Sequence, residues 1–286
     1  RLRPLVGANK TSAKAPPALA VKLLTRLHPE FRRRTRSAQR LQHERPWREM
    51  CLRWQAEIRP ELERVNLAHQ DVDLVSLDDA ELADELAARL AHCRTTFEQH
   101  FYLHGFDLGP IGMLMLDCRE EWNLSTAEVV PALVGASPST SGPARTAARI
   151  RAALAETGSR PTTLDELRAV SPVVRELVDD YVRLRGHMVY GRYDLDGPTL
   201  QEAPDVLLAT FVRGTTLAPH RPELAEAVAA ELRERVPAAD RASFDERLRE
   251  ARAAMDLRDD NGPNTIEWPI GLLRGAMLEA ARRLSE

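Results

Sequence analysis

The stretch SLDDAELADELAARLAHCRTTFEQHF, residues 76–101, decides the fold class because it has the periodicity of a long amphipathic helix. Ser76 followed three residues later by Asp79 predicts a capped N-terminus. Apolar side chains then recur at steps of three or four residues, as one face of a helix requires. The residues expected on this buried face are Leu82, Leu86, Leu90, Cys93 and Phe97.

The same signals recur downstream and predict further helices. Ser125 with Glu128, and Thr162 with Asp165, repeat the capping pattern. Helices are also expected over residues 203–213, 223–236 and 238–255, and a terminal helix is expected after a turn at residues 261–264. Residues 135–144, rich in Pro, Gly and Ser, are expected to form a loop.

One further helix is bracketed by Pro172 at a first helical position and by Gly186 as a stop. Its expected buried stripe consists of Val174, Leu177, Val178, Tyr181 and Leu184. Neither strand-like alternation nor a repeat of fixed period is visible. The sequence therefore predicts an all-α fold, an irregular multi-helix bundle with a Gly-rich cleft loop.

The composition is that of a soluble globular protein. The 286 residues are 43% hydrophobic and 29% charged, with a net charge of −3. This balance favours neither nucleic acid nor a membrane as partner, and no signal peptide or membrane span is apparent. Cys51, Cys93 and Cys118 are widely spaced, which is typical of reduced core thiols in a cytoplasmic protein.

Domain organisation is suggested by local composition. Residues 1–70 form a basic, Trp-bearing helical lead-in, and residues 71–286 form the main bundle. Within the lead-in, the arginine run at residues 31–36 is interpreted as a solvated helix face.

Signatures of nucleotide-binding loops, dinucleotide folds, zinc proteases and nucleophile elbows do not occur in the sequence. A metal site could be imagined from His92, Cys93, His100 and His104, since the last two are one helical turn apart. No acidic residue completes a zinc-protease ligand set there, so ordinary histidines are the preferred interpretation and no metal ligand is assigned.

The segment RGHMVYGRYDLDGPTL, residues 185–200, interrupts the helical pattern with two permissive glycines. Five polar-capable side chains crowd into eight positions: His187, Tyr190, Arg192, Tyr193 and Asp194. The residues alone leave two interpretations open. The segment either lines a functional cleft or caps a helix and plugs the end of the bundle with tyrosines.

This segment is similar to a stretch of the phosphoenolpyruvate-utilising enzymes, which include phosphoenolpyruvate synthases and rifampicin phosphotransferases. The matched positions are Gly186, His187, Gly191, Tyr193, Asp194, Leu195, Pro198, Glu202 and Pro204. Two later blocks, AAMDLRDDNG at 253–262 and GLLRGAMLEAARRLSE at 271–286, agree in the same order. The resemblance covers residues 71–286, but Arg192 stands where the family has glutamate.

The resemblance implies the central helical, acceptor-binding domain of an ATP-dependent phosphotransferase. In that family an ATP-grasp domain and a swivelling phosphohistidine domain supply the phosphoryl group, and neither is present in this chain. ATP and magnesium are therefore expected in the full-length enzyme, and no cofactor or catalytic residue is expected here. The expected partners are a small-molecule acceptor and those two domains, and the acceptor contacts are assigned to His187, Tyr190, Arg192, Tyr193 and Arg258.

Two alternatives remain open. The same architecture could serve an ATP-dependent ligase in natural-product biosynthesis, which the altered loop would suit. The chain could instead be a noncatalytic helical interaction module, which predicts an exposed apolar patch.

The charge reversal at Arg192 generates a test. We expect Arg192→Glu to abolish turnover of the full-length enzyme, because a reversed charge would repel an acceptor that this guanidinium holds. Helix content measured by circular dichroism should not change. Unimpaired turnover would contradict the assignment of this loop.

Overall fold

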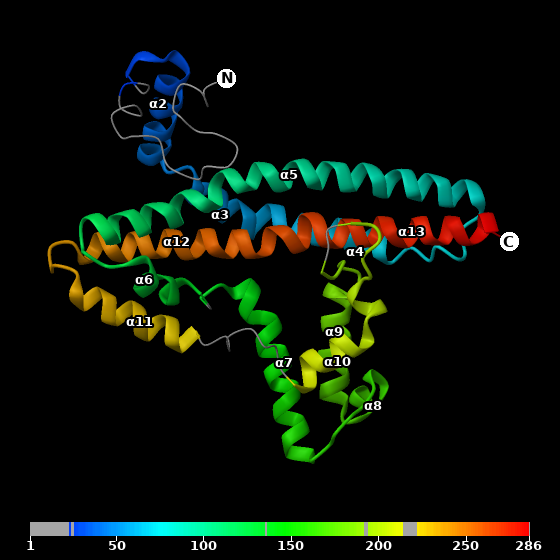
Figure 1. The fold of residues 1–286 in the computed structure, drawn as a ribbon. Coiled ribbons are helices and arrows are strands. Elements are labelled where there is room, and N and C mark those ends of the chain that lie inside the picture. The colour runs from blue at the N-terminus through cyan, green and yellow to red at the C-terminus, as the bar shows by residue number, and fades with distance from the viewer. Residues whose placement is uncertain (1–22, 24–25, 135, 192–193, 214–221, 286) are drawn as a thin grey trace, which may run out of the picture. The chain divides into compact units, whose positions relative to one another are not determined.

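A computed structural model describes residues 23, 26–134, 136–191, 194–213 and 222–285 (Figure 1). The all-α prediction is confirmed, since the regular elements of the described residues are helices. Among the described residues, β pairing is limited to one isolated antiparallel bridge between Val189 and Thr199. None of the described helices combines the length and the apolar character needed to cross a bilayer.

The chain divides into two compact units, Arg1–Arg48 and Glu49–Glu286. In the first unit, α2 (Pro29–Glu44) buries none of its residues, as the interpretation of its arginine run as a solvated face requires. Arg33 and Arg34 both hydrogen-bond the Glu30 carboxylate and hold its pKa at about 2. The sequence-based boundary after residue 70 falls inside the second unit, where α4 packs against α13.

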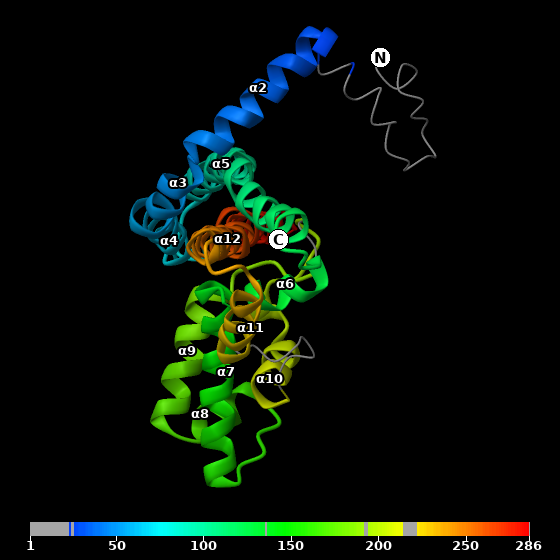
Figure 2. The same ribbon diagram turned by 90° about the vertical axis from the view of Figure 1, so that its left-hand side faces the viewer.

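Long helices form the framework of the second unit. The helix α5 (Asp79–Glu120) runs antiparallel to a continuous helical run. Two contacts show this direction: Asp79 pairs with Arg283 at one end, and Trp122 meets Phe244 edge-on at the other. That run consists of α12 (Arg241–Gly262), the π turn η3 (Pro263–Glu267) and α13 (Trp268–Ser285). A third run lies beside it (Figure 2) and consists of α3 (Trp47–Arg53), the π turn η1 (Trp54–Ile58) and α4 (Arg59–Gln70).

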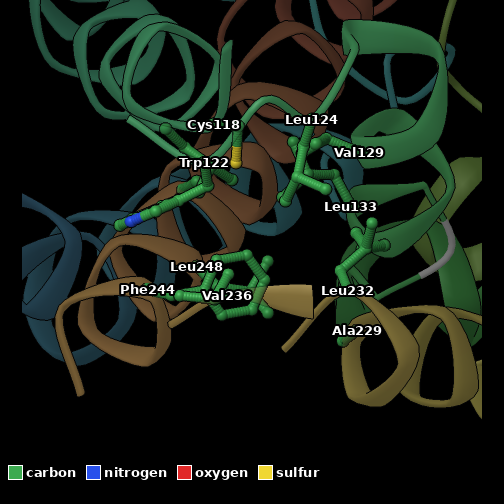
Figure 3. Close-up of a cluster of buried hydrophobic side chains, with 13 residues drawn as sticks. Cys118, Trp122, Leu124, Val129, Leu133, Ala229, Leu232, Val236, Phe244 and Leu248 are labelled. Atoms are coloured by element: carbon green, nitrogen blue, oxygen red, sulfur yellow. The ribbon is translucent and has the colours of Figure 1, made fainter. Parts of the chain in front are cut away.

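The remaining helices pack in two groups. The first group comprises α6 (Thr126–Leu133) and α11 (Pro222–Arg235), which join α5 and α12 in one apolar cluster (Figure 3). The second group has its own apolar cluster and comprises α7 (Pro138–Thr157), α8 (Leu164–Ala169), α9 (Pro172–Arg185) and α10 (Pro204–Val212), with the short turn η2 (Leu200–Glu202) beside them.

The helix α5 begins two residues later than predicted, at a capping box formed by Asp78 and Glu81. Five of its buried positions recur every seven residues: Leu82, Arg89, Thr96, Leu103 and Pro110. The predicted apolar face is therefore wrong at Leu90 and Phe97, which are half exposed. The pattern of apolar residues misled because two of the buried positions carry polar side chains.

The turn predicted at residues 261–264 is wrong, because the chain continues there as a π turn between α12 and α13. Proline normally breaks a helix because it lacks an N–H and crowds the preceding turn. Here Pro263 begins the wider π turn, and the Asn264 amide donates to the backbone carbonyl and carboxylate of Asp260. Side chains that usually favour turns are buried in this protein, and their hydrogen bonds stabilise the helical backbone instead.

The loop predicted over residues 135–144 is wrong in its second half, since α7 begins at Pro138. A proline suits a first helical position, and the carboxylate of Asp256 accepts the backbone N–H of Ser139 at 3.0 Å. A buried acid from a distant helix thus stabilises this N-terminus.

Most of the other predicted helices are confirmed. The capping box of Ser125 and Glu128 is present, whereas the predicted pair Thr162 and Asp165 is displaced by one residue to Thr163 and Glu166. The helices expected at 203–213 and 223–236 are α10 and α11, and the one expected at 238–255 extends to Gly262.

Helix α9 spans Pro172–Arg185 with Gly186 as its C-cap, as the proline and glycine signals predicted. Its stripe is buried at Val174, Leu177 and Val178. The prediction fails at Leu184, which is 45% exposed.

The cysteines are free thiols, and two of them lie in the core. Burial raises the pKa of Cys51 to about 11 and that of Cys118 to about 12. Because the thiolate is the reactive form, these two cysteines are inert at neutral pH.

The cluster in Figure 3 generates a stability prediction. Phe244 is fully buried and its ring meets Trp122 edge-on, with centroids 5.6 Å apart. We expect Phe244→Ala to lower the free energy of unfolding by about 3–5 kcal/mol in urea titrations, because it removes apolar contacts and leaves a cavity. The matched control is Leu284→Ala, at a side chain that is 90% exposed and should cost below about 0.5 kcal/mol. Equal losses of unfolding free energy in the two variants would contradict the packing described for Phe244.

Candidate functional site

The loop predicted to carry function folds back on itself as a short hairpin. The Tyr190 N–H donates to the Pro198 carbonyl at 2.8 Å, and the Leu200 N–H donates to the Met188 carbonyl at 3.0 Å. The Val189 N–H reaches outside the hairpin to the Glu267 carbonyl at 3.1 Å. The backbone of the loop is thereby fixed to the π turn η3.

Apolar side chains fasten the same loop to the helical framework. Met188 packs against Trp268 and Leu272, and Val189 packs against Ile266 and Ile270. Tyr190, the next residue, is 48% exposed. The loop thus presents this phenol outward from a buried base.

A glycine on α13 permits this close seating. A Cβ atom at Gly271 would lie 1.6 Å from the carbonyl oxygen of His187, closer than any two such atoms can approach. Within the loop, Gly191 has φ of +80°, a conformation that L side chains rarely adopt. Both glycines are therefore needed for the observed loop geometry.

Several residues on which the expected family resemblance rests have structural roles in the loop. The Asp194 carboxylate accepts the Gly197 N–H at 2.9 Å. Glu202 accepts the N–H and hydroxyl of Thr199 and pairs with Arg274 at 2.6 Å. The guanidinium of Arg274 also donates to the Leu195 carbonyl at 3.1 Å. These positions set the shape of the loop.

His187 is partly buried at the base of the loop. Its Nδ1 lies 3.3 Å from the Gln201 amide nitrogen. Burial lowers the pKa of His187, and the nearby Arg89 cation lowers it further, so the imidazole is neutral at neutral pH. A neutral ring can accept a hydrogen bond from the Gln201 amide and donate one from its other nitrogen.

Arg89 is a buried cation that joins three elements near this loop. Its guanidinium donates to the Glu85 carboxylate on α5, to the Leu272 carbonyl on α13 and to the His69 carbonyl on α4. The Glu85 carboxylate also contacts His69 Nδ1 at 3.0 Å. This network supports the helices beneath the loop and is itself closed to ligands, since Arg89 is only 3% exposed.

The predicted site residues are only partly brought together. His187 and Tyr190 share the loop, whereas Arg258 lies on the exposed face of α12 with its guanidinium 4.0 Å from Met255 Sδ. No hydrogen bond between described residues joins Arg258 to the loop. Arg192 and Tyr193 lie outside the described residues.

Two of the cavities formed by described residues are well defined, and these two are not lined by His187 or Tyr190. One, of about 460 Å³, is lined by α2 and its arginines. The other, of about 330 Å³, lies between the first turns of α8 and α10, where Asp165, Arg168 and Asp205 contribute polar groups. Its volume is at the lower end of those that bind small molecules.

Sequence reasoning missed a seam of buried polar groups along α12 and η3. Asp256 accepts hydrogen bonds from Ser137, Ser139 and Gln55. One turn later, Asp260 lies 3.3 Å from the Arg59 guanidinium, and burial raises its pKa despite that cation. No motif marks these acids, because each of them finds its partners on helices remote in sequence.

The four residues that could form a metal site on sequence grounds, His92, Cys93, His100 and His104, do not all meet at one point. His92 Nε2 lies 2.8 Å from Asn66 Oδ1, and burial lowers its pKa to about 4, while Cys93 packs near Val189. Only His100 and His104 meet, with their Nε2 atoms 3.0 Å apart. Within the described part of the chain, no three His, Cys, Asp or Glu side chains gather as metal ligands.

Asp107 completes this pair from the same face of α5. Its Oδ2 lies 2.6 Å from His104 Nδ1, and the residue is fully buried. The spacing of three residues was visible in the sequence, since residues three and four apart are neighbours on a helix. In the zinc-protease pattern the acid lies between the two histidines, whereas Asp107 follows the second one, so that pattern does not reveal it.

Comparisons of the chain with protein-family models, curated proteins and solved structures found no match.

The contact between Gly271 and His187 generates a second prediction. We expect Gly271→Ala to displace the loop and to lower the free energy of unfolding by about 1–3 kcal/mol, because the added methyl overlaps a backbone carbonyl. Amide hydrogen exchange at Val189 and Tyr190 should accelerate. The matched control is Gly112→Ala on α5, where a Cβ meets nothing within 4 Å. Unchanged exchange at Val189 in the first variant would show that the loop is not seated as described.

Proposed function

We propose that this chain is the acceptor-binding helical domain of an ATP-dependent phosphotransferase that works by a swivelling phosphohistidine relay onto a small molecule. The observation that carries the proposal is the construction of the loop from Gly186 to Glu202. The positions that match the phosphoenolpyruvate-utilising enzymes hold the backbone in shape, as the contacts of Asp194 and Glu202 illustrate. A loop held in shape by its own side chains is a suitable base for an acceptor site.

The side chains available to an acceptor are those that the loop does not use to hold itself. Tyr190 presents a half-exposed phenol, and His187 offers a neutral imidazole at the base. Arg192 and Tyr193 are assigned to the same role from the sequence. Together these groups would supply hydrogen-bond donors, an acceptor and one cation to a polar small molecule.

The contribution of such a domain to phosphoryl transfer would be positional. Transfer needs an aligned acceptor oxygen, a bound nucleotide with magnesium and a nucleophile that carries the phosphoryl group. The loop would hold the acceptor, and the ATP-grasp and phosphohistidine domains of the intact enzyme would provide the rest. Anchoring to η3 and α13 fits this role, because positioning depends on a fixed backbone.

A test of the proposal compares two exposed tyrosines in the intact enzyme. Its open reading frame should encode an ATP-grasp domain before this chain and a phosphohistidine domain after it. With ATP and a panel of small-molecule acceptors, we expect a phosphorylated product, and we expect Tyr190→Ala to lower kcat/KM for the acceptor by about 10-fold or more, the loss of roughly one good contact. Tyr102→Ala on α5, at a tyrosine that is 60% exposed, should leave it unchanged.

The outcomes of this test separate the alternatives. A joined product in place of a phosphorylated one would indicate the ligase. Equal kcat/KM for the Tyr190→Ala and wild-type enzymes would contradict the role of the loop, and a reading frame without the two flanking domains would contradict the phosphotransferase.

One observation favours the interaction module as a second candidate. Apolar side chains on α5 are about half exposed or more at Leu90, Phe97, Phe101 and Leu108, spaced by seven, four and seven residues. Such spacing forms a continuous stripe on a helix and is typical of helix-to-helix contacts. Under this candidate, Phe101→Ser would abolish binding of a partner polypeptide without ATP, and Tyr190→Ala would not.

A further inference from the structure

We propose that His100 and His104 form a two-imidazole binding site for a divalent late first-row metal ion, with Asp107 and Thr265 holding the two rings in place. The inference rests on the hydrogen-bond network of α5 and η3 and does not depend on the proposed phosphotransfer function. It goes beyond the sequence patterns, which assigned no metal ligand to these histidines.

The first step assigns the proton on His104. Its Nδ1 lies 2.6 Å from Oδ2 of Asp107, a residue with no exposed surface. A carboxylate only accepts hydrogen bonds, so the imidazole must donate from Nδ1. The Nε2 atom of a neutral His104 therefore carries a lone pair.

The second step assigns the proton on His100. Its Nδ1 lies 3.0 Å from the Thr265 hydroxyl oxygen. That hydroxyl has a single hydrogen, which it donates to the Asn261 carbonyl one helical turn earlier. We therefore assign Thr265 as the acceptor from His100, which places the proton on Nδ1 here too and leaves a lone pair on Nε2.

The two Nε2 atoms are 3.0 Å apart, so both lone pairs lie within reach of one shared positive species. Two acceptors at this distance repel unless a positive species lies between them, either a proton or a metal ion. The surroundings favour positive charge, because Asp107 is a buried acid whose Oδ1 has no hydrogen-bond partner among the described residues.

The spacing suits a metal ion. Imidazole nitrogens bind zinc at about 2.0–2.1 Å, and at that distance two nitrogens 3.0 Å apart subtend about 90° at the ion. An angle near 90° fits the tetragonal geometry of nickel and copper, with water at the remaining positions. The His104 side chain is 36% exposed, so an ion can enter from solvent.

The outer hydrogen bonds of the pair are those of a metal-binding histidine. Such ligands usually donate their other ring N–H to a carboxylate or another oxygen, which fixes the tautomer and the orientation of the ring. Asp107 serves His104 in this way and Thr265 serves His100. Both rings are therefore oriented before any ion binds.

The test titrates the 286-residue chain with Ni²⁺, and separately with Zn²⁺, by calorimetry. We expect saturable binding of one ion, weakened about 10-fold or more by His104→Gln. Asp107→Asn keeps both ligands and should weaken binding by about 10–100-fold, the usual effect of losing an outer partner. The matched control is His43→Gln, at an exposed histidine of α2, which should leave affinity unchanged.

A second measurement needs no variant and guards against misfolding. Long-range ¹H–¹⁵N spectra of the wild-type histidines without metal should show Nδ1–H tautomers at His100 and His104, and saturating diamagnetic Zn²⁺ should shift both Nε2 signals. The proposal is overturned if neither ion binds saturably, if His43→Gln weakens binding as much as His104→Gln, or if a proton between the Nε2 atoms persists at saturating Zn²⁺.

Discussion

Buried polar side chains on α5 and α12 fix how the helices of this structure lie against one another. An unpaired polar group in a protein interior costs free energy of about 1–3 kcal/mol, so each such residue fixes the position of a partner on another helix. Arg89 fixes α4 and α13 relative to α5, and Asp256 fixes the start of α7 relative to α12. The apolar clusters fill the space that these pairings define.

The helical class and most helix boundaries could be predicted from the sequence, because they depend on local capping and periodicity. Ser125 with Glu128 and Pro172 with Gly186 mark their helices as expected. The failures at residues 135–144 and 261–264 have one cause. Residues that favour turns when solvated are stabilised in helices here by remote partners, Asp256 for the Ser139 N–H and the His100 carbonyl for the Asn261 amide, which no local pattern reveals.

The candidate sites divide in the same way. The loop around Tyr190 is visible in the sequence because its glycines and aromatic residues are contiguous. The pairing of His104 with Asp107 was within reach of helical spacing, but the role of Thr265 required the fold, since 165 residues separate it from His100. Arg258 was assigned as an anion contact because guanidinium groups bind phosphate, and no described contact joins it to the loop.

The two π turns have a consequence for how this protein tolerates change. A π turn is equivalent to one residue added to an α-helix, and it rotates every later side chain by about 100° around the axis. The face that α13 offers to α4 and α5 is therefore set by the extra residue within η3. Loops usually absorb the deletion of a single residue. In this protein, the loss of one residue from η3 would instead rotate all eighteen residues of α13 relative to their neighbours.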